Sequence, residues 1–415
     1  MKRWGKLLAC AMLALAAVHA AAAPHAASAA AGKIGIMLDG YPLPFAAEPV
    51  VENGTTLVPF RSISEALGVN VVWDAEHKSI TATKDTKQIV LKLGDKKAWV
   101  NGKEELLAVA PRSAGGHTLI PISFFSRQFG AIVEWNGAAK TVTIVSPKEP
   151  MYTLGFYAIS SFSERSYISK FDSVAFGWSR LDAGGSFTLE GNDFKWPQPA
   201  GDYTPERLVE DTYANGSTPY LMVFSGDANL ELSGVLADKE KQENLINQVI
   251  QAATDNGFKG VLLDFEGLGL TGDKTTVRAE YNAFVKNAAD RAKQSGLKLA
   301  IAVHPLNGPY KGYDYAALGN LADELIIMAY AYEDEKSPEP DNKVDEAIRL
   351  ALKETAKEKL VLGISLASEN VNSVHVKTGL AKRYGLKGIA IWRLGLIGSD
   401  AMSQMESSIE FGRMK

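Results

Sequence analysis

The segment Gly-Val-Leu-Leu-Asp-Phe-Glu-Gly, at residues 260–267, is the stretch around which the rest of the chain is organised. Its apolar first half is typical of a buried parallel strand. Asp264 and Glu266 follow at positions i and i+2, so that on a strand both carboxyl groups lie on one face. Two neighbouring acids at the end of a buried strand repel each other and lose hydration, which favours a catalytic role. The simpler alternative is a strand end that meets solvent with two surface acids.

Short apolar stretches of this kind recur along the C-terminal two thirds of the chain. Eight of them alternate with helical stretches, which is typical of a parallel sheet whose strands are connected by helices. This pattern predicts an α/β fold of the (β/α)8 TIM barrel type. A doubly wound sheet is the alternative, but no Gly-x-Gly-x-x-Gly motif follows any of the strands. The expected strands lie at residues 152–157, 173–178, 219–224, 260–265, 298–303, 324–330, 359–364 and 388–392, and the clearest helices at 205–214, 239–256, 279–295, 344–358 and 399–411.

Composition narrows the class of protein. The 415 residues are 46% hydrophobic and 22% charged, as in ordinary globular proteins that are long enough for more than one domain. The net charge of -4 gives no sign of a nucleic acid or an anionic membrane as a partner. The single cysteine, Cys10, lies in the leader, and the histidines show no metal-ligand spacing. We therefore expect no disulfide, metal or cofactor, and a monomer because nothing marks an oligomer interface.

Residues 1–30 have the pattern of a secretory signal peptide. A basic head at residues 1–6 precedes an apolar core at 7–18, and alanine-rich small-residue sites follow. The apolar run is too short for a good transmembrane span, and no other stretch is suited to one. Leu-Leu-Ala-Cys at 7–10 resembles a lipoprotein box, but almost no apolar segment precedes it. We expect an exported protein that is soluble or held at the cell wall by affinity.

Residues 33–146 contain an internal repeat with an offset of 62 positions. Thr-Leu-Val-Pro at 56–59 recurs as Thr-Leu-Ile-Pro at 118–121, and Trp73 recurs as Trp135. Each unit is expected to contain a strand, a short helix and a hairpin near its tryptophan. A tryptophan at equivalent places in a repeat is more often a core residue, so we expect both in the core; sugar-stacking platforms are the alternative.

This repeat resembles the copper amine oxidase N-terminal-like module, also called the stalk domain, of secreted proteins from spore-forming Gram-positive bacteria. The resemblance implies a small α+β repeat domain with a spacer or wall-association role. Copper binding is not expected, because His77 and His117 occupy non-equivalent positions in the two units. Residues 146–150 form a linker that is too short for wide domain excursions, and the barrel domain is expected over residues 151–415.

The C-terminal ends of the predicted barrel strands carry acids and aromatic residues. In a barrel of this type the active site lies at these ends. Sugar rings pack their C–H faces on aromatic rings, and cleavage of a glycosidic bond needs carboxyl groups, so the combination predicts a sugar site. Aromatic strand ends alone are weak evidence, because the same residues fill barrels. The candidates for substrate binding are Tyr157, Trp178, Phe224, His304, Tyr332, Trp392 and Arg393.

Three of the strands resemble those of family 18 glycoside hydrolases. The matching residues are Asp-Phe-Glu at 264–266, Met-Ala-Tyr at 328–330 and Trp392. Gly-Phe-Tyr at 155–157 and the segment 388–395 are similar to the spore cortical-fragment-lytic branch of that family. The resemblance covers essentially residues 151–415.

The resemblance implies a role for each motif residue. Glu266 matches the general acid that protonates the leaving-group oxygen and later activates water. Asp264 matches the residue that orients the acetamido group of the substrate, whose oxygen attacks C1 to give an oxazolinium intermediate and a retaining outcome. Tyr330 matches the hydroxyl group that hydrogen-bonds this acetamido group, and Trp392 matches the hydrophobic floor under the −1 sugar.

The sequence departs from the family motif D-x-x-D-x-D-x-E, because Lys259 and Leu262 stand where its first two acids are expected. In addition, Ala331 follows Tyr330, where the family often has aspartate. Three functions remain open. Cleavage of β-linked N-acetylglucosamine in peptidoglycan or spore-cortex fragments is favoured by the branch resemblance. Chitin hydrolysis would use the same mechanism, and non-catalytic binding of wall glycans is favoured slightly by Leu262.

Overall fold

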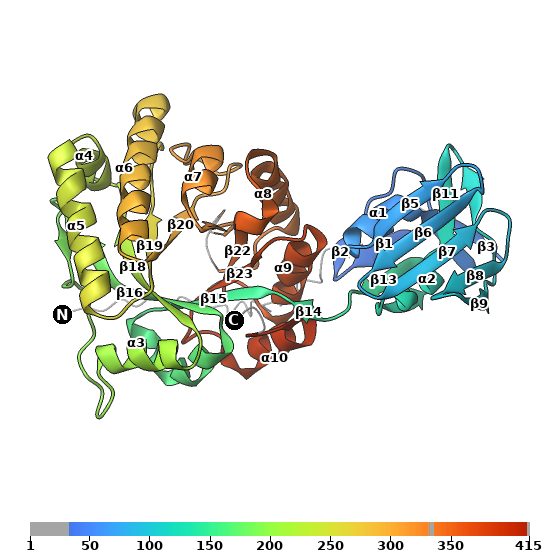
Figure 1. Ribbon diagram of the computed structural model, residues 1–415, viewed down its shortest axis with the longest axis horizontal. Coiled ribbons are helices and arrows are strands. Elements are labelled where there is room, and N and C mark those ends of the chain that lie inside the picture. The colour runs from blue at the N-terminus through green and yellow to red at the C-terminus, as the bar shows by residue number, and fades with distance from the viewer. Residues whose placement is uncertain (1–32, 331, 333–335, 413–415) are drawn as a thin grey trace, which may run out of the picture.

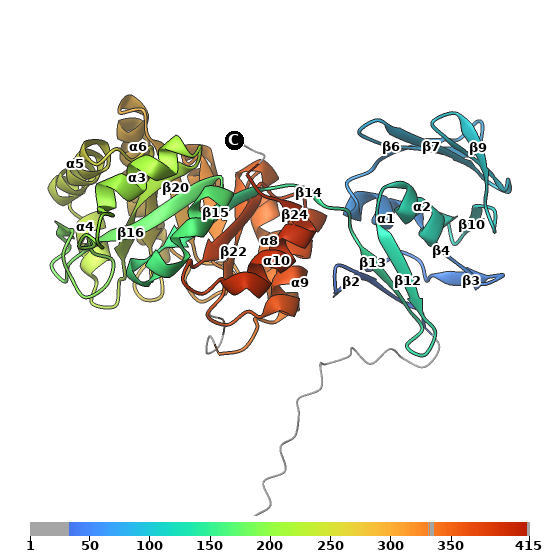
Figure 2. The same ribbon diagram turned by 90° about the horizontal axis from the view of Figure 1, so that it is seen from below.

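The structure, a computed structural model, describes residues 33–330, 332 and 336–412. The expected signal peptide, residues 1–30, lies outside the described residues. Figures 1 and 2 show an N-terminal domain in blue to cyan and a larger barrel in green to red, joined by an extended segment. Among the described residues, no helix combines the length and the apolar character that crossing a membrane requires.

The larger body is a closed barrel of eight parallel strands. β15 (Tyr152–Tyr157) hydrogen-bonds to both β16 and β23, which closes the sheet. A short strand, β17 (Phe187–Thr188), adds an antiparallel hairpin to β16. The predicted TIM barrel is therefore confirmed. The other barrel strands are β16 (Ser173–Leu181), β18 (Thr218–Ser225), β19 (Gly260–Phe265), β20 (Lys298–Val303), β21 (Glu324–Ile327), β22 (Leu360–Ser365) and β23 (Gly388–Trp392).

Helices cover the outside of the barrel (Figure 1). α6 (Lys274–Gln294) begins five residues earlier than predicted, because the Asp273 side chain accepts hydrogen bonds from the first backbone N–H groups of the helix. α9 (Val371–Arg383), which the sequence pattern did not predict, begins at a capping box formed by Asn370 and Ser373. The others are η1 (Ile159–Lys170), α3 (Pro205–Ala214), α4 (Glu231–Leu236), α5 (Lys239–Asp255), α7 (Tyr315–Leu321), α8 (Asp341–Glu354), η2 (Lys357–Lys359) and α10 (Gly398–Ser408).

Alternation along the barrel strands divides the buried side chains into two layers. Residues such as Leu154, Met222 and Leu262 point into the barrel and form an inner core. Residues of the opposite parity, such as Leu263 and Phe265, pack between the strands and the helices in a larger outer core. A side chain at the C-terminal end of a strand therefore reaches the mouth of the barrel only if it has the inward parity.

The N-terminal domain consists of three small sheets and two short helices. Helices α1 (Phe60–Ala66) and α2 (Ile122–Gln128) lie between the sheet that holds β6 and β7 and the strands β12 and β13 (Figure 2). The main apolar core contains residues of both units. The strands are β1 (Gly35–Leu38), β2 (Tyr41–Pro42), β3 (Val50–Glu52), β4 (Thr55–Pro59), β5 (Asn70–Asp74), β6 (Ser79–Lys84), β7 (Lys87–Lys92), β8 (Lys97–Val100), β9 (Lys103–Leu106), β10 (Arg112–Ala114), β11 (His117–Pro121), β12 (Ile132–Asn136) and β13 (Thr141–Val145).

The two repeat units are related by an approximate twofold axis that passes between Val58 and Ile120. These equivalent residues lie opposite each other where β4 and β11 pair antiparallel. β1 of the first unit also pairs in parallel with β13 of the second. The first unit therefore adds a strand to a sheet of the second, and the two units share another sheet, which explains why the sequence repeat forms one domain.

The prediction that the repeated tryptophans belong to the core is wrong. Trp73 and Trp135 are 41% and 52% exposed. Each is the penultimate residue of a strand, β5 or β12, that lies at the edge of its sheet and pairs with only one neighbour. The apolar core ends before these positions, at Val71 and Val133, so both rings extend beyond it.

The two domains are joined by paired strands and by α9. The linker strand β14 (Glu149–Pro150) pairs with β24 (Ile409–Glu410) after the last helix of the barrel. The Arg383 guanidinium of α9 donates to the backbone carbonyl oxygens of Leu38, Tyr41 and Pro42, at 3.3, 3.0 and 3.0 Å. These bonds hold the β1–β2 hairpin of the N-terminal domain against the barrel.

Candidate active site

A cavity of about 210 Å³ opens where the C-terminal ends of the barrel strands meet. Its acidic side chains are Asp264 and Glu266, at the end of β19. The other lining residues are Phe194, His304, Met328, Tyr330 and Trp392. Five of the residues singled out from the sequence, Asp264, Glu266, His304, Tyr330 and Trp392, are therefore brought together in one cavity.

Strand alternation accounts for this grouping. Asp264 and Glu266 continue the inward row that contains Leu262, while Met328 and Tyr330 continue the inward row of β21 that begins with Ile326. Space for the Tyr330 ring is provided by Gly363 on the neighbouring strand, where a Cβ atom would lie 2.9 Å from the ring. The barrel thus presents side chains from several strands to one point.

The two carboxyl groups of the cavity differ in environment. Asp264 is only 4% exposed, and its Oδ1 atom has no hydrogen-bond partner among the described residues. Burial, with the charge of Glu266 as a second cause, raises the pKa of Asp264 well above its usual value. The Glu266 side chain is 38% exposed and so faces the open part of the cavity. Asp264 therefore holds a proton more readily than an ordinary aspartate, while Glu266 is accessible to a substrate.

Leu262 occupies the place of the acid that the sequence motif lacks. It is fully buried in the inner core, one inward position below Asp264. Its apolar side chain offers no proton and no hydrogen bond to the carboxyl group above it. This absence contributes to the low polarity around Asp264.

His304 flanks the acid pair in its neutral form. Its ring stacks on Tyr310, with 4.0 Å between the ring centres, and burial lowers the pKa of His304 to about 4. The Nε2 atom accepts a hydrogen bond of 3.4 Å from the Gly267 backbone N–H and lies 4.0 Å from Oε2 of Glu266. With Nε2 acting as an acceptor, the ring proton is assigned to Nδ1.

Aromatic rings form another part of the cavity wall. The Phe194 ring stacks on Phe224, with 4.2 Å between ring centres and 14° between planes, and lies 6.3 Å from the Trp392 ring. Asp193, next to Phe194, forms an ion pair with Arg180 on β16, which ties the loop to the barrel. Phe224 therefore supports the cavity from behind Phe194 and is not one of its lining residues.

The structure corrects the assignment of Tyr157 and Trp178 to substrate binding. Both have the outward parity, are buried in the outer core, and pack with Phe176 between the strands and the helices. Neither lines the cavity. Tyr157 ends its strand as predicted, whereas β16 continues three residues past Trp178, and both rings point to the helix side of the sheet.

Tyr332 and Arg393 also lie apart from the cavity lining. The Tyr332 hydroxyl donates to Oδ1 of Asn307 at 2.9 Å. Arg393 donates to the hydroxyl oxygen of Ser160, which lies in η1 after the first barrel strand. Both side chains therefore bond to residues that do not line the cavity.

Two lining residues, Phe194 and Met328, were not among the candidates from the sequence. Met328 belongs to the Met-Ala-Tyr motif and has the inward parity, so alternation alone identifies it. Phe194 follows the β17 hairpin in a segment without helix or strand and has a left-handed backbone with φ of 46°. No pattern of period two or 3.6 marks such a position.

The described residues that line the cavity form no grouping suited to a metal ion. Across the part of the chain that the structure describes, no cluster of three or more histidine, cysteine, aspartate or glutamate side chains has the arrangement of a metal site. The acid pair and the single neutral histidine are suited instead to proton transfer.

Comparison with known protein families follows the same division of the chain. The model of glycosyl hydrolases family 18 matches residues 168–374, which include the strands that carry the acids and Tyr330. The barrel belongs to glycosyl hydrolases family 18. The model of the copper amine oxidase N-terminal domain matches residues 37–144. Both resemblances expected from the sequence are confirmed.

Relatives of this family 18 chain include the cortical fragment-lytic enzyme of Bacillus subtilis (strain 168). The two are 28% identical over 165 residues, which cover 36% of this chain and 37% of the relative. A second enzyme of that name, from Bacillus anthracis, is 26% identical over 39% of this chain and 40% of its own. The chain thus matches about two fifths of the length of these curated relatives.

Among solved structures, the spore cortex-lytic enzyme SleL of Bacillus cereus is similar, with a TM-score of 0.52 and 17% identity over 64% of this chain and 76% of its own. A chitinase from Chromobacterium violaceum has a TM-score of 0.52 and 20% identity over 62% of this chain and 98% of its own. At these identities the likeness shows a shared barrel fold.

Proposed function

We propose that this chain is an exported glycoside hydrolase that cleaves β-linked N-acetylglucosamine in peptidoglycan or spore-cortex fragments. One observation carries this proposal: Asp264 and Glu266 share a cavity with Tyr330 and Trp392 at the C-terminal end of a family 18 barrel. A carboxyl pair, a hydroxyl group and an aromatic floor are the groups that substrate-assisted cleavage requires. The names of the cortical fragment-lytic relatives support cortex or wall glycan as the substrate class.

In the proposed reaction the substrate supplies its own nucleophile. The acetamido oxygen attacks C1, the bond from C1 to the leaving oxygen breaks, and Glu266 gives its proton to that oxygen. The Glu266 carboxylate then takes a proton from a water molecule, which attacks C1 and opens the oxazolinium ring. Two displacements at C1 retain its configuration, and Glu266 ends protonated as it began.

Asp264 and its neighbours orient the acetamido group and stabilise the oxazolinium intermediate in this scheme. The carboxyl group of Asp264 orients the acetamido group, together with the Tyr330 hydroxyl. The raised pKa of Asp264 makes its charged form costly without substrate, and positive charge on the oxazolinium ring offsets this cost. The neutral His304 ring adds no positive charge that would oppose the developing cation.

The decisive experiment combines product analysis with a single substitution. Mass spectrometry of digests of purified spore cortex should show fragments that end in reducing N-acetylglucosamine, and Glu266→Gln should lower their release by about 10²- to 10⁴-fold. The matched control is Glu243→Gln on α5, whose side chain contacts Arg291 on the protein surface. A Glu266→Gln variant with the wild-type rate would refute the assignment.

Two further measurements test the mechanism and the substrate class. Nuclear magnetic resonance of the first product should show the retained anomer, and oligosaccharides without the N-acetyl group should not be cleaved. Faster turnover of chitooligosaccharides than of cortex fragments would identify the chain as a chitinase instead.

A non-catalytic, glycan-binding role is the second candidate function. It is favoured by Leu262, which leaves Asp264 without the neighbouring acid of the family motif. Binding of cortex fragments with no new reducing ends at any pH between 4 and 8 would support this role over hydrolysis.

A further inference from the structure

A second hollow, of about 610 Å³, lies on the N-terminal domain beside helix α1. Trp73 and Phe60 form part of its wall, and Arg61, Glu65 and His117 are among its polar residues. It shares no residue with the cavity of the barrel. The proposed reaction makes no use of this groove.

Trp73 supplies the groove with an exposed aromatic ring. Because the ring stands beyond the end of the core, it is 41% exposed and offers a flat apolar surface to solvent. Trp135 holds the equivalent position in the second unit and is 52% exposed, but it lines neither this groove nor the active-site cavity. Exposure is thus common to both tryptophans, but only Trp73 lines this groove, together with residues of both units.

The polar side chains that line the groove with Trp73 have no hydrogen-bond partner among the described residues. Arg61, Glu65, Ser113 and His117 line the groove, and none of their side chains forms a hydrogen bond or an ion pair with another residue that the structure describes. They offer donors and acceptors in the same groove as an apolar ring. Sugars present C–H faces flanked by hydroxyl groups, so the groove has the complementary chemistry.

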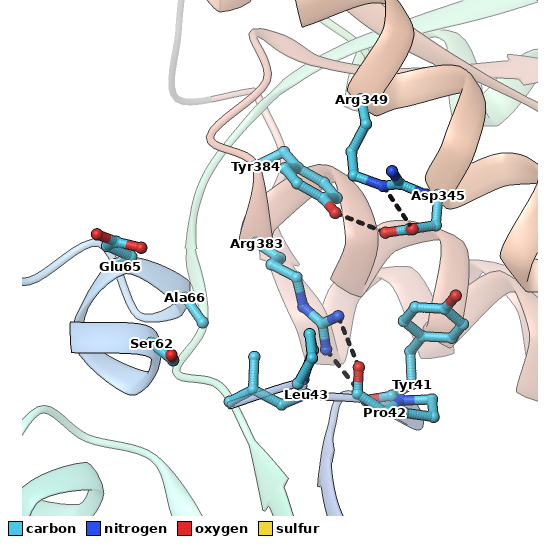
Figure 3. A pocket seen from close by; sticks show the side chains of 11 residues that line it. Tyr41, Pro42, Leu43, Ser62, Glu65, Ala66, Asp345, Arg349, Arg383 and Tyr384 are labelled. Carbon is cyan, nitrogen blue, oxygen red and sulfur yellow. Dashed lines mark hydrogen bonds and ion pairs between the residues drawn. The ribbon is translucent and has the colours of Figure 1, made fainter. Parts of the chain in front are cut away.

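The groove continues toward the barrel along helix α1. Ser62 and Glu65 line it and also line a cavity of about 680 Å³ between the two domains. The barrel contributes Arg349 of α8 and Tyr384, next to the end of α9, to that cavity (Figure 3). Figure 3 shows the Ser62 and Glu65 side of α1 facing these barrel residues across the gap. Two hollows that meet at shared residues suit an extended polymer better than a single sugar.

We propose that the face of helix α1, from Trp73 to the interdomain cavity, binds a β-linked N-acetylated glycan polymer, with Trp73 as the stacking platform. The identity of the polymer rests on the proposed function of the barrel. The bonds that Arg383 makes to the β1–β2 hairpin hold the N-terminal domain against the barrel. One strand of the polymer can therefore contact both domains.

The test uses the full chain with Glu266→Gln, so that a bound polymer is not cut. Sedimentation with insoluble peptidoglycan sacculi, and in a second arm with chitin, measures the binding constant. Trp73→Ala should weaken binding about three- to tenfold, the usual contribution of one aromatic stacking contact. Trp135→Ala is the matched control, and it should stay within about twofold of the parent.

Equal binding by the Trp73→Ala variant and its parent, on both polymers, would overturn the proposal. Equal losses in the Trp73→Ala and Trp135→Ala variants would do the same, because they would indicate contact with exposed tryptophans in general. Loss on one polymer alone supports the groove and identifies which glycan it takes. The binding assay needs no turnover, so it remains informative if the barrel proves inactive. Thermal unfolding of each variant controls for misfolding.

Discussion

Nε2 of His304 lies 4.0 Å from Oε2 of Glu266, and the same nitrogen accepts the backbone N–H of Gly267. The ring is buried against Tyr310 and Tyr313, so a proton on Nε2 would break the bond from Gly267 and place a charge among aromatic rings. A neutral imidazole beside the proposed acid is therefore part of the folded state at neutral pH.

The first prediction concerns stability in acid. The pKa of His304 is lowered to about 4, while an unfolded chain has the usual value near 6.5. Between these values the unfolded chain binds a proton that the folded chain does not, so stability falls as the pH drops from about 6.5 to about 4. The loss amounts to at most roughly 3 kcal/mol, and His304→Gln should remove that share of the slope.

Urea unfolding at pH 4.5 and pH 7 measures this slope. His77→Gln is the matched control, because that side chain is 69% exposed on a hairpin of the N-terminal domain. If the His304→Gln variant and the wild type lost stability in parallel, His304 would not be neutral in the folded chain.

The second prediction concerns Asp264 and has the opposite sign. A raised pKa means that the folded chain keeps a proton that the unfolded chain releases, so this group's contribution to stability is lost as the pH rises through its folded pKa. Asn cannot ionise, and Asp264→Asn should therefore gain stability relative to the wild type between pH 4 and pH 8. The same substitution should abolish turnover if Asp264 orients the acetamido group.

Melting temperatures across that range provide the measurement. Asp290→Asn on α6, where the carboxylate is 60% exposed and paired with Lys286, is the control and should show no such trend. A difference between Asp264→Asn and the wild type that does not change with pH would contradict the raised pKa.

The third prediction separates the aromatic residues of the core from those of the cavity. Trp178→Ala removes a fully buried ring of the outer core and should cost about 3–5 kcal/mol of stability. Phe194→Ala removes a ring from the cavity wall. It should raise KM, and it should lower the free energy of unfolding less than Trp178→Ala does. Guanidinium unfolding and steady-state kinetics on one substrate distinguish the two. A specific KM effect of Trp178→Ala in the folded enzyme would restore it as a substrate-binding residue.

The fourth prediction concerns the junction between the domains. Arg383→Ala removes donors to three carbonyl groups and should loosen the contact by on the order of 3 kcal/mol. Arg383→Lys should retain part of the contact, because an ammonium group cannot reach all three oxygens in the geometry of a planar guanidinium. The expected result is an increased radius of gyration in X-ray scattering, largest for Ala.

Arg291→Ala, on the exposed face of α6, is the control for this experiment. A variant at Arg383 with unchanged scattering would show that the strand pairing of the linker is sufficient to hold the domains. Gly379→Ala provides an independent test, because a Cβ atom there would lie 2.3 Å from Cβ of Asp39.

Regular patterns explain why most of the barrel was predictable from the sequence. Strands such as β19 and β20 are apolar runs with clear ends, and their bounds agree with the prediction. α9 was not predicted, because Gly379 and the β-branched residues near its start lower helix propensity. Packing of α9 on β22 and β23 stabilises the helix instead.

The active site was predictable where chemistry and parity agree, as for Asp264, Glu266 and Tyr330. Tyr157 and Trp178 show the limit of residue type as a criterion, because both lie on the side of their strands that faces the helices. Phe194 shows a different limit, since its place in the cavity depends on the loop held by the Asp193–Arg180 ion pair. Contacts of that kind join residues without any regular spacing.

The pairing of Val58 with Ile120 also bears on how the two units differ. In a dimer of identical chains, every change of a side chain appears on both sides of the axis. Covalent linkage of two copies removes that constraint while keeping the shared sheet. At the positions of Arg61 and Glu65 in the first unit, the second unit has Ser123 and Arg127, while both units have an exposed tryptophan. The backbone of the duplicated domain is thus approximately symmetric about the β4–β11 pairing, while its surface side chains are not.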